Sequence, residues 1–267
     1  MTALAVLERF LSAQPALAMV DVTRARGSTP REEGAWMLVS PGATIGTIGG
    51  GTLEFMAIDR ARAALAGRIA TDEMDVPLGP EIGQCCGGRV ELSIRLMDDA
   101  AREALLLRER AADARLPHIL VFGGGHVGHA LASAFALLPV KVTVVETRAE
   151  ALEGMPPAID IKLTPVPEEV VRAAQAGSAI VVLTHDHSLD FLIVAEALKR
   201  SDLAYVGMIG SKTKRATFRS WYLKEAGGTE ADFGRLVSPI GGDGVRDKRP
   251  AVIAALAAAE IMTALVR

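Results

Sequence analysis

The chain has 267 residues, of which 50% are hydrophobic, and its 29 basic and 32 acidic residues give a formal net charge of −3. This length fits two domains of ordinary size, and the charge balance argues against a basic nucleic-acid-binding surface. No apolar run is long enough to span a membrane, and the start lacks the features of a secretory signal, so we expect a cytoplasmic protein.

The first part of the chain mixes helices and strands without regular alternation, which predicts a smaller N-terminal α+β domain over residues 1–97. Leucines at helical spacing predict a helix near the start, and a glycine-rich turn over 46–54 opens a second helix. The expected helices cover 2–13 and the stretch up to about residue 65, and the expected strands cover 17–23, 35–39, 73–78 and 89–96.

Two loops of this first part are candidate ligand-binding segments. The turn at 24–31 carries arginines, whose guanidinium groups suit phosphates, although an exposed charged turn is an equal alternative. The triple glycine at 49–51 would let the backbone approach a planar ligand, or would simply form a bend between strand and helix. The candidate residues in these two loops are Arg26, Ser28, Arg31, Gly49, Gly50 and Gly51.

The only two cysteines, Cys85 and Cys86, are adjacent in a loop that reads Gly-Gln-Cys-Cys-Gly-Gly. Neighbouring residues are too close for a relaxed disulfide, and a glycine-rich loop is approachable, so free thiols are expected there. Such thiols would act as soft metal ligands or as a sulfur relay. The alternative is a pair of small, half-buried thiols in a tight turn.

The second part of the chain alternates apolar strands with helices. Asp98 and Asp99 begin a linking helix that we assign to residues 98–116, because aspartate favours helix starts. The alternation that follows predicts a Rossmann-like, doubly wound parallel sheet over residues 117–267. The expected strands cover 118–122, 141–146, 160–163, 179–183, 203–209 and 235–239.

A G-x-G-x-x-G motif follows the first of these strands. Gly123 would permit the tight turn, Gly125 would let the backbone approach a phosphate, and Gly128 would allow close helix packing. Glu146 ends the next strand, at the position of an acid that binds a ribose in nucleotide-binding sheets. The alternative is a Rossmann-like scaffold that holds no dinucleotide.

Four of the five histidines follow strands of the predicted sheet. His126 and His129 follow the first strand, and His185 and His187 follow the strand at 179–183. In doubly wound order these strands are neighbours at the switch point, where such folds bind ligands. The imidazoles would then converge and, with Asp186 and Asp190, hold a metal or relay protons. The alternative is that His126 and His129 cap polar helix starts and never meet the other two.

Gly210, Ser211 and Lys212 open a helix after another strand, where a phosphate would find a basic first turn. The spacing of the glycines and the lysine differs from that of a P-loop, so ATP hydrolysis is not expected. A solvated basic helix start is an equal alternative.

Taken together, these motifs resemble the XdhC/CoxI family, accessory proteins of molybdenum hydroxylases such as xanthine dehydrogenase. The resemblance spans nearly the whole chain, but the closing motif at 244–251 departs where Arg246 and Asp247 replace commoner small residues. The motifs that carry it are Gly-Ser-Thr-Pro-Arg at 27–31, the glycine-rich 46–51, the cysteine loop at 83–88, Gly-Gly-Gly-His-Val-Gly at 123–128, His-Asp-His-Ser-Leu-Asp at 185–190 and Tyr-Val-Gly-Met-Ile-Gly-Ser at 205–211.

The resemblance implies a protein that binds molybdenum cofactor, a pterin dithiolene with a terminal phosphate. Such a protein would protect the cofactor, support its sulfuration with a cysteine desulfurase and deliver it to xanthine dehydrogenase. The family role would place Cys85 and Cys86 at the molybdenum. It would also make the protein a chaperone rather than a turnover enzyme, consistent with the lack of a compact catalytic triad.

Two other functions compete with this one. The G-x-G-x-x-G motif and Glu146 fit an NAD(P)-dependent oxidoreductase, and the histidines fit a metal-dependent hydrolase. The sequence also allows a homodimer, because small apolar residues fill the last helix at 254–259. The same residues would equally pack inside one subunit.

Overall fold

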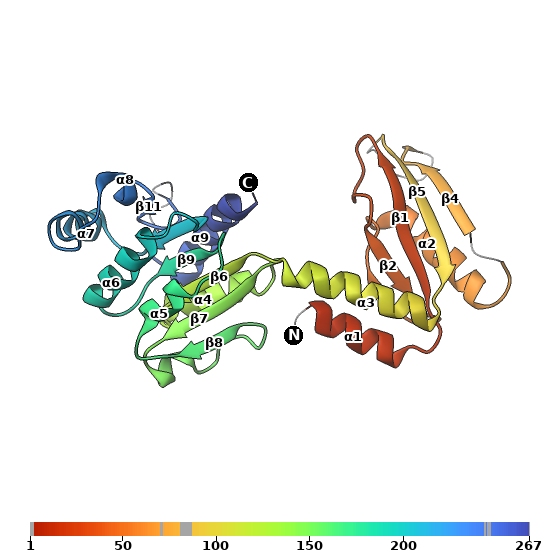
Figure 1. Cartoon of the computed structure of the whole chain (residues 1–267). Coiled ribbons are helices and arrows are strands. Elements are labelled where there is room, and N and C mark those ends of the chain that lie inside the picture. Colours follow the sequence, from red (N-terminus) through yellow and green to blue (C-terminus); the bar gives the residue numbers. More distant parts are fainter. Residues whose placement is uncertain (1–2, 70–71, 81–86, 243, 245–246, 267) are drawn as a thin grey trace. The chain divides into compact units, whose positions relative to one another are not determined.

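The computed structural model describes residues 3–69, 72–80, 87–242, 244 and 247–266. The predicted site residues Cys85 and Cys86 lie outside this described part. The chain divides into two compact units, residues 1–114 and 115–267, and each is considered by itself (Figure 1). In the described part, the helices are all too short or too polar to cross a bilayer.

The first unit is built on a five-stranded antiparallel sheet in the order β3-β2-β1-β5-β4. The predicted α+β class is confirmed. The short strand β3 was not predicted, and only its last residue, Gly46, falls in the glycine-rich turn expected at 46–54. The strands are β1 (Ala18–Arg26), β2 (Trp36–Val39), β3 (Thr44–Gly46), β4 (Asp72–Pro77) and β5 (Arg89–Leu96).

Both faces of this sheet are covered. Alternate residues of β1 point to opposite faces, as the two-residue period of a strand requires: Val20 and Val22 pack with the helix α2 (Gly51–Leu65), whereas Met19 packs with leucines of α1 (Ala3–Ala13) and α3 (Asp99–Ala114). Helices α1 and α3 lie side by side in Figure 1. The sheet therefore has a hydrophobic core on each side.

The second unit contains a six-stranded parallel sheet in the order β11-β10-β9-β6-β7-β8. This order is that of a doubly wound fold, and the chain reverses direction of winding between β6 and β9. The predicted Rossmann-like sheet is therefore confirmed. The strands are β6 (His118–Phe122), β7 (Lys141–Glu146), β8 (Asp160–Leu163), β9 (Ala179–Val182), β10 (Tyr205–Met208) and β11 (Leu236–Val237).

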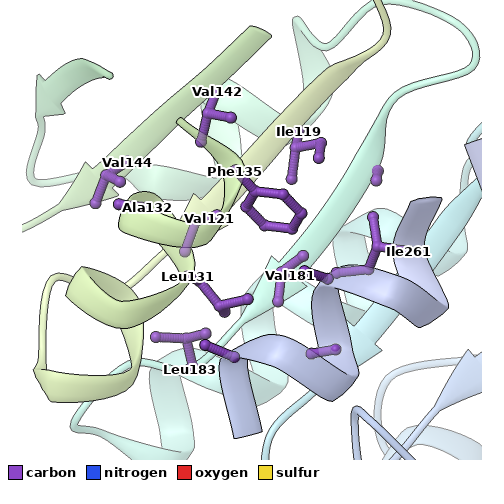
Figure 2. Close-up of a cluster of buried hydrophobic side chains, with 14 of the residues drawn as sticks. Ile119, Val121, Leu131, Ala132, Phe135, Val142, Val144, Val181, Leu183 and Ile261 are labelled. Carbon is purple, nitrogen blue, oxygen red and sulfur yellow. The ribbon is translucent and has the colours of Figure 1, made fainter. Parts of the chain in front are cut away.

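Helices cover both faces of the parallel sheet, which is why its central strands are apolar throughout. On one face, Leu131 and Phe135 of α4 and Ile261 of α9 pack against Val121 and Val181 (Figure 2). On the other, α5, α6 and α7 enclose the second core. The helical segments are α4 (His126–Phe135), η2 (Ala149–Leu152), α5 (Pro167–Arg172), α6 (His187–Leu198), α7 (Lys212–Lys224), α8 (Glu230–Phe233) and α9 (Pro250–Leu265).

The small residues of α9 pack inside this unit. Ala254, Ala257 and Ala258 are buried against the core around α4, while Ala255 and Ala259 are exposed on the opposite side of the helix. Of the two explanations that the sequence allowed for these alanines, the structure favours internal packing, because the buried ones let α9 approach the sheet and α4 closely.

Candidate functional site

The loops that leave β6, β7, β9 and β10 surround a cavity of about 260 Å³ at the carboxyl edge of the parallel sheet. As predicted, β6 and β9 are neighbours, so the residues that follow them face one crevice. This is the switch point at which doubly wound folds bind ligands. The lining residues are Gly125, His126, Val127, Arg148, Leu183, Thr184, His185 and Ile209.

The glycines of the G-x-G-x-x-G loop serve close packing and access to the cavity. Gly123 has φ +119°, and an added Cβ would lie 2.4 Å from the carbonyl oxygen of Leu183. A Cβ on Gly128 would lie 2.1 Å from the carbonyl oxygen of Gly123. A Cβ on Gly125, by contrast, would meet no atom within 4 Å. The backbone of Gly125 is therefore left uncovered where it lines the cavity.

Helix α4 starts at this cavity without a side-chain cap. Its N-cap residue is Gly125, which has no side chain to accept hydrogen bonds from the first turn. The N–H groups at a helix start carry positive partial charge and are satisfied by anions when no cap is present. The start of α4 therefore favours a negatively charged group in the cavity.

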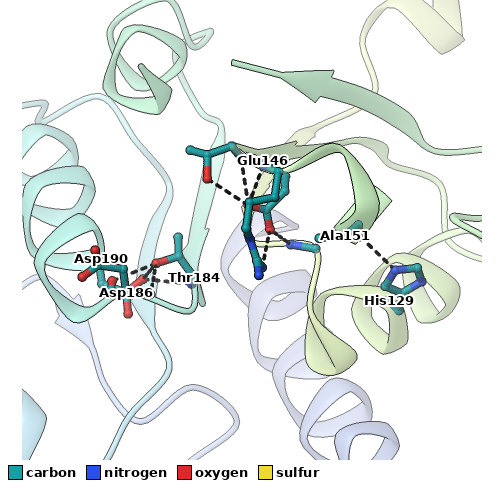
Figure 3. Close-up of polar contacts among 9 residues, drawn as sticks. His129, Glu146, Ala151, Thr184, Asp186 and Asp190 are labelled. Carbon is teal, nitrogen blue, oxygen red and sulfur yellow. Dashed lines mark hydrogen bonds and ion pairs between the residues drawn. The ribbon is translucent and has the colours of Figure 1, made fainter. Parts of the chain in front are cut away.

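Glu146, at the end of β7, is buried and surrounded by hydrogen-bond donors (Figure 3). Its Oε2 accepts from the backbone N–H of Gly124 at 2.8 Å, and its Oε1 accepts from the backbone N–H of Thr147 at 2.8 Å. Burial acts to raise the pKa of this carboxyl, but the hydrogen bonds from Gly124, Arg148 and Thr147 outweigh it and lower the pKa below its usual range. Glu146 is therefore an ionised group that anchors the glycine-rich loop.

Arg148 connects this carboxylate to the cavity. Its Nε lies 3.4 Å from Glu146 Oε1 and its Nη2 lies 3.4 Å from Oε2, and Arg148 is also one of the residues that line the cavity. The Arg148 side chain is 37% exposed and that of Glu146 only 3%. A buried carboxylate thus holds a positively charged group at the edge of the cavity. Sequence reasoning missed Arg148, because the motif draws attention to the acid alone.

The structure brings two of the four predicted histidines to the cavity. His126 and His185 line it. The ring of His129 instead points to the carbonyl oxygen of Ala151, with Nε2 at 3.1 Å (Figure 3), and His187 is the first residue of α6. Among the residues that the structure describes, no group of three or more histidines, cysteines and acids is placed to hold a metal ion.

Asp190 lies beneath the cavity in a buried ion pair. Its Oδ1 accepts hydrogen bonds from the backbone N–H and the hydroxyl of Thr184 at 2.9 and 2.7 Å, and its Oδ2 pairs with Lys214 Nζ. Lys214 Nζ also donates to the carbonyl oxygen of Ile209 at 3.0 Å. The pair therefore ties two residues of the cavity lining, Thr184 and Ile209, to the first turns of α6 and α7.

The predicted segment at 210–212 contributes to this arrangement rather than to the cavity lining. Gly210 has φ +156°, and an added Cβ would lie 2.5 Å from Lys214 Cδ, so glycine is needed for the lysine side chain to pass. Ser211 caps α7 by accepting from the N–H of Lys214 at 3.3 Å, and Lys212 is the first residue of that helix.

In the first unit, three of the predicted loops meet. A Cβ on Gly49 would lie 2.4 Å from Cγ of Pro30, and a Cβ on Gly88 would lie 2.2 Å from the carbonyl oxygen of Ser28 and 2.8 Å from that of Arg26. Gly88 is the last residue of the cysteine loop at 83–88. The turn at 24–31 thus packs against the triple glycine through the ring of Pro30, and against the end of the cysteine loop through the backbone of Arg26 and Ser28.

The triple glycine is held by an acid at the start of α2. Glu54 Oε2 accepts from the hydroxyl of Thr47 at 2.6 Å and from the N–H of Gly50 at 3.1 Å, and Gly50 and Gly51 have φ +76° and +64°. Arg31 Nη1 donates to the carbonyl oxygen of Thr47 at 3.3 Å. The loop is therefore a built feature with a defined backbone, in which left-handed conformations require glycine.

The first unit has a cavity of about 390 Å³ between α1 and α3. Its charged groups already have partners: Arg110 pairs with Glu8 at 2.7 Å, and Arg102 donates to the carbonyl oxygens of Leu11, Gln14 and Pro15. Arg102 therefore satisfies carbonyl groups at the C-terminal end of α1 that have no partner within the helix. The described residues of this cavity offer no group that points to a ligand.

Two family models match the chain. The model of the XdhC Rossmann domain matches residues 119–261, and that of the XdhC and CoxI family matches residues 10–73. The first match alone covers more than half of the sequence. This chain belongs to the XdhC and CoxI family, and the family that its motifs resemble is confirmed.

This XdhC-family chain is also similar to a protein in sequence and to another in structure. The uncharacterized protein YqeB of Escherichia coli (strain K12) is 27% identical over 262 residues, which are 92% of this chain and 43% of YqeB, so the chain spans less than half of that relative. A crystal structure from Bacillus halodurans, described as that of a xanthine dehydrogenase, has a TM-score of 0.80 at 18% identity. The match covers 100% of this chain and 96% of the Bacillus halodurans chain, which shows that the two share a fold.

Within the XdhC Rossmann domain, the structure therefore separates the predicted residues into groups. Gly125, His126 and His185 line the cavity, whereas Glu146 and Asp190 lie behind it and hold the lining in place. The lining residue Arg148 and the supporting residue Lys214 were not predicted. Arg148 follows Glu146 by two residues, and this spacing is the signal in the sequence that could have pointed to it. Lys214 is 24 residues from Asp190, so no local signal links the two.

Proposed function

We propose that this chain is an accessory protein of xanthine dehydrogenase that binds molybdenum cofactor, protects it and delivers it to the enzyme. The observation that carries the proposal is a cavity lined by Gly125 at a helix start and by Arg148, at the switch point of a domain that belongs to the XdhC family. The terminal phosphate of the cofactor is a group that such a cavity would accept, because an uncapped helix start and an arginine both favour anions.

The cavity suits one end of the cofactor rather than all of it. Its volume of about 260 Å³ is slightly below the range of about 300–1,000 Å³ that is usual for sites enclosing a whole small molecule. The phosphate end would sit by Gly125, His126 and Arg148, and the remainder would extend out of the cavity. When bound, the cofactor would supply the molybdenum whose ligand is exchanged during maturation.

For the sulfur chemistry, we propose Cys85 and Cys86 as soft ligands or sulfur relays, with a cysteine desulfurase as the partner that provides the sulfur. What supports this part is the family membership and the packing of Gly88 against the turn that carries Arg26 and Ser28. Arg26, Ser28, Arg31 and the triple glycine at 49–51 would then form the surroundings of the thiols.

Anaerobic equilibrium binding of isolated molybdenum cofactor tests the proposal. We expect the wild-type protein to bind the cofactor, and Cys85→Ala and Cys86→Ala to show which thiol contributes. Transfer is then measured as the activity that cofactor-loaded protein restores to cofactor-free xanthine dehydrogenase, with free cofactor at the same concentration as the control. Absence of binding by the wild-type protein would refute the proposal.

An NAD(P)-dependent oxidoreductase is the second candidate, favoured by the doubly wound strand order and the G-x-G-x-x-G loop. The hydrogen bonds that already surround Glu146 count against it, because a dinucleotide site needs that acid for the ribose. Fluorescence titration with NADH distinguishes the candidates: a cofactor chaperone should show no saturable binding at millimolar NADH.

A further inference from the structure

We infer that Arg148 is the anion-binding residue of the cavity and that Glu146 serves to position it, so that the Rossmann domain takes a phosphomonoester rather than a dinucleotide. This inference deepens the proposed function and rests on it for the identity of the natural ligand. The binding chemistry itself is argued from the two side chains and the cavity.

The carboxylate of Glu146 has no capacity left for a ligand. A carboxylate offers about four lone-pair positions, and here six contacts reach it. Oε1 receives the N–H and hydroxyl of Thr147 and the N–H and Nε of Arg148, at 2.8, 3.2, 3.2 and 3.4 Å. Oε2 receives the N–H of Gly124 and Nη2 of Arg148, at 2.8 and 3.4 Å. Two ribose hydroxyls would have to displace these donors.

Arg148, in contrast, still has hydrogen-bond donors that a ligand could use. A guanidinium has five N–H donors, and Glu146 engages Nε and Nη2 through long contacts of 3.4 Å. Nη1 makes no hydrogen bond to any described residue. Since the side chain is 37% exposed and lines the cavity, the unused donors are available to an anion there.

The rest of the lining gives this arginine no competitor. Among the described lining residues, Arg148 is the only one with a permanent charge, and none is acidic. The hydroxyl of Thr184 is already donated to Asp190 at 2.7 Å. His126 and His185 add ring nitrogens that can form hydrogen bonds. A dianionic phosphate with three strong acceptor oxygens matches a guanidinium beside an uncapped helix start.

The test uses inorganic phosphate as the probe and ³¹P NMR line broadening as the measurement. We expect saturable binding to the wild-type protein, at least tenfold weaker binding to Arg148→Gln, and partial retention in Arg148→Lys. The matched control is Arg172→Gln, because Arg172 is also half-exposed and pairs with a glutamate, Glu196, at 3.3 Å, but lies outside the cavity. Equal affinity in wild type and Arg148→Gln would overturn the inference.

Loss of Arg148 leaves the Glu146 charge less compensated, so folding needs a separate check. The double variant Glu146→Gln/Arg148→Gln keeps the pair neutral and the side-chain sizes similar. It should retain the wild-type circular dichroism and melting temperature and still lose phosphate binding at least tenfold. Phosphate binding by this folded variant at wild-type affinity would contradict the role of Arg148.

The preference for a phosphomonoester is tested with NADH. We expect NADH to bind no more tightly than inorganic phosphate, both in the wild type and in Glu146→Gln. NADH binding tenfold or more tighter, with that gain lost in Glu146→Gln, would show a ribose-binding acid and overturn the inference. If molybdenum cofactor binds but phosphate does not, this inference fails while the proposed function stands. If phosphate binds through Arg148 but molybdenum cofactor does not bind, the proposed function fails while this inference about phosphate binding stands.

Discussion

The ammonium group of Lys214 and the carboxylate of Asp190 form an ion pair in which both side chains are buried, 8% and 0% exposed. The same ammonium donates to the carbonyl oxygen of Ile209, and the same carboxylate accepts from Thr184. Because Thr184 and Ile209 line the cavity, the pair fixes two of its walls from behind. Its partners come from the ends of two neighbouring strands and the first turns of the helices that follow them.

Replacement of Lys214 should therefore destabilise the Rossmann domain. Lys214→Met leaves the Asp190 carboxylate buried without its counter-charge, which typically costs about 3–5 kcal/mol. Urea unfolding followed by the fluorescence of Trp221, in a Trp36→Phe background, reports this domain. The double variant Lys214→Met/Asp190→Asn should recover part of the loss, because it removes the uncompensated charge.

Lys224→Met is the control for the lysine variant, because Lys224 is an exposed residue at the end of the same helix. A surface substitution of this kind should change stability by less than about 0.5 kcal/mol. A loss in Lys214→Met as small as in Lys224→Met would show that the buried pair does not hold the loops.

A second prediction concerns Gly128 in α4. Replacing glycine by alanine inside a helix normally stabilises by up to about 1 kcal/mol. Here the new Cβ would lie 2.1 Å from the carbonyl oxygen of Gly123, a backbone atom that cannot move aside easily. We expect Gly128→Ala to lose about 1–3 kcal/mol, as overpacked sites do, in the same urea assay. Gly125→Ala, where the Cβ meets no atom within 4 Å, should keep its stability; a stabilising Gly128→Ala would refute the close packing.

The sequence predicts the Rossmann half well because local patterns determine it. Apolar strands such as 118–122 and 179–183 alternate with helices, and right-handed crossovers leave few possible strand orders. The switch point and the two histidines that line its cavity follow from that order. The first unit is harder, because the three-residue strand β3 contains Gly46 and has no alternation to recognise.

The polar contacts behind the cavity could not be predicted in the same way. Lys214 and Asp190 are 24 residues apart, and their contact exists only once β9 and β10 lie side by side. Glu146 occupies the position of a ribose-binding acid, and only the structure shows that Gly124 and Arg148 already engage it. Sequence motifs indicate which residue types gather at a site, whereas their partners depend on side-chain directions in the folded chain.

A third prediction tests the meeting of two loops in the first unit. Gly49 has φ +128°, and an added Cβ would lie 2.4 Å from Cγ of Pro30. Gly34 has φ +85° with open space around it, so Gly34→Ala measures backbone strain alone. We expect Gly49→Ala to lose about 1–3 kcal/mol more than Gly34→Ala, the usual cost of overpacking. The measurement is urea unfolding followed by Trp36 in a Trp221→Phe background.

The contact with Pro30 predicts a specific rescue. A Pro30→Ala background removes Cγ, the nearer of the two Pro30 atoms that collide with the new Cβ, and leaves only Cβ at 2.8 Å. Gly49→Ala should therefore cost less there than in the wild type. Equal costs in the two backgrounds would mean that the triple glycine and the turn at 24–31 are not packed together.

The last prediction concerns pH and His118, the first residue of β6. Its Nε2 lies 2.9 Å from the hydroxyl of Thr143, and burial lowers the pKa of the ring, although Asp160 nearby partly opposes this. Folding therefore favours the neutral imidazole. The stability that depends on it is fully present above the unfolded-state pKa of about 6.5. It is lost progressively as the pH falls from there through the lower folded-state pKa.

We accordingly expect the wild-type Rossmann domain to lose stability between pH 7.5 and pH 5 more steeply than His118→Gln, whose amide can still bond to Thr143 but does not titrate. Urea midpoints followed by Trp221 at half-unit pH steps give the slopes. His187→Gln is the control for the replacement of a histidine by glutamine, because His187 is exposed at the start of α6. Parallel curves for the wild type and His118→Gln would show that the folded protein accepts a protonated His118, against the burial seen at the start of β6.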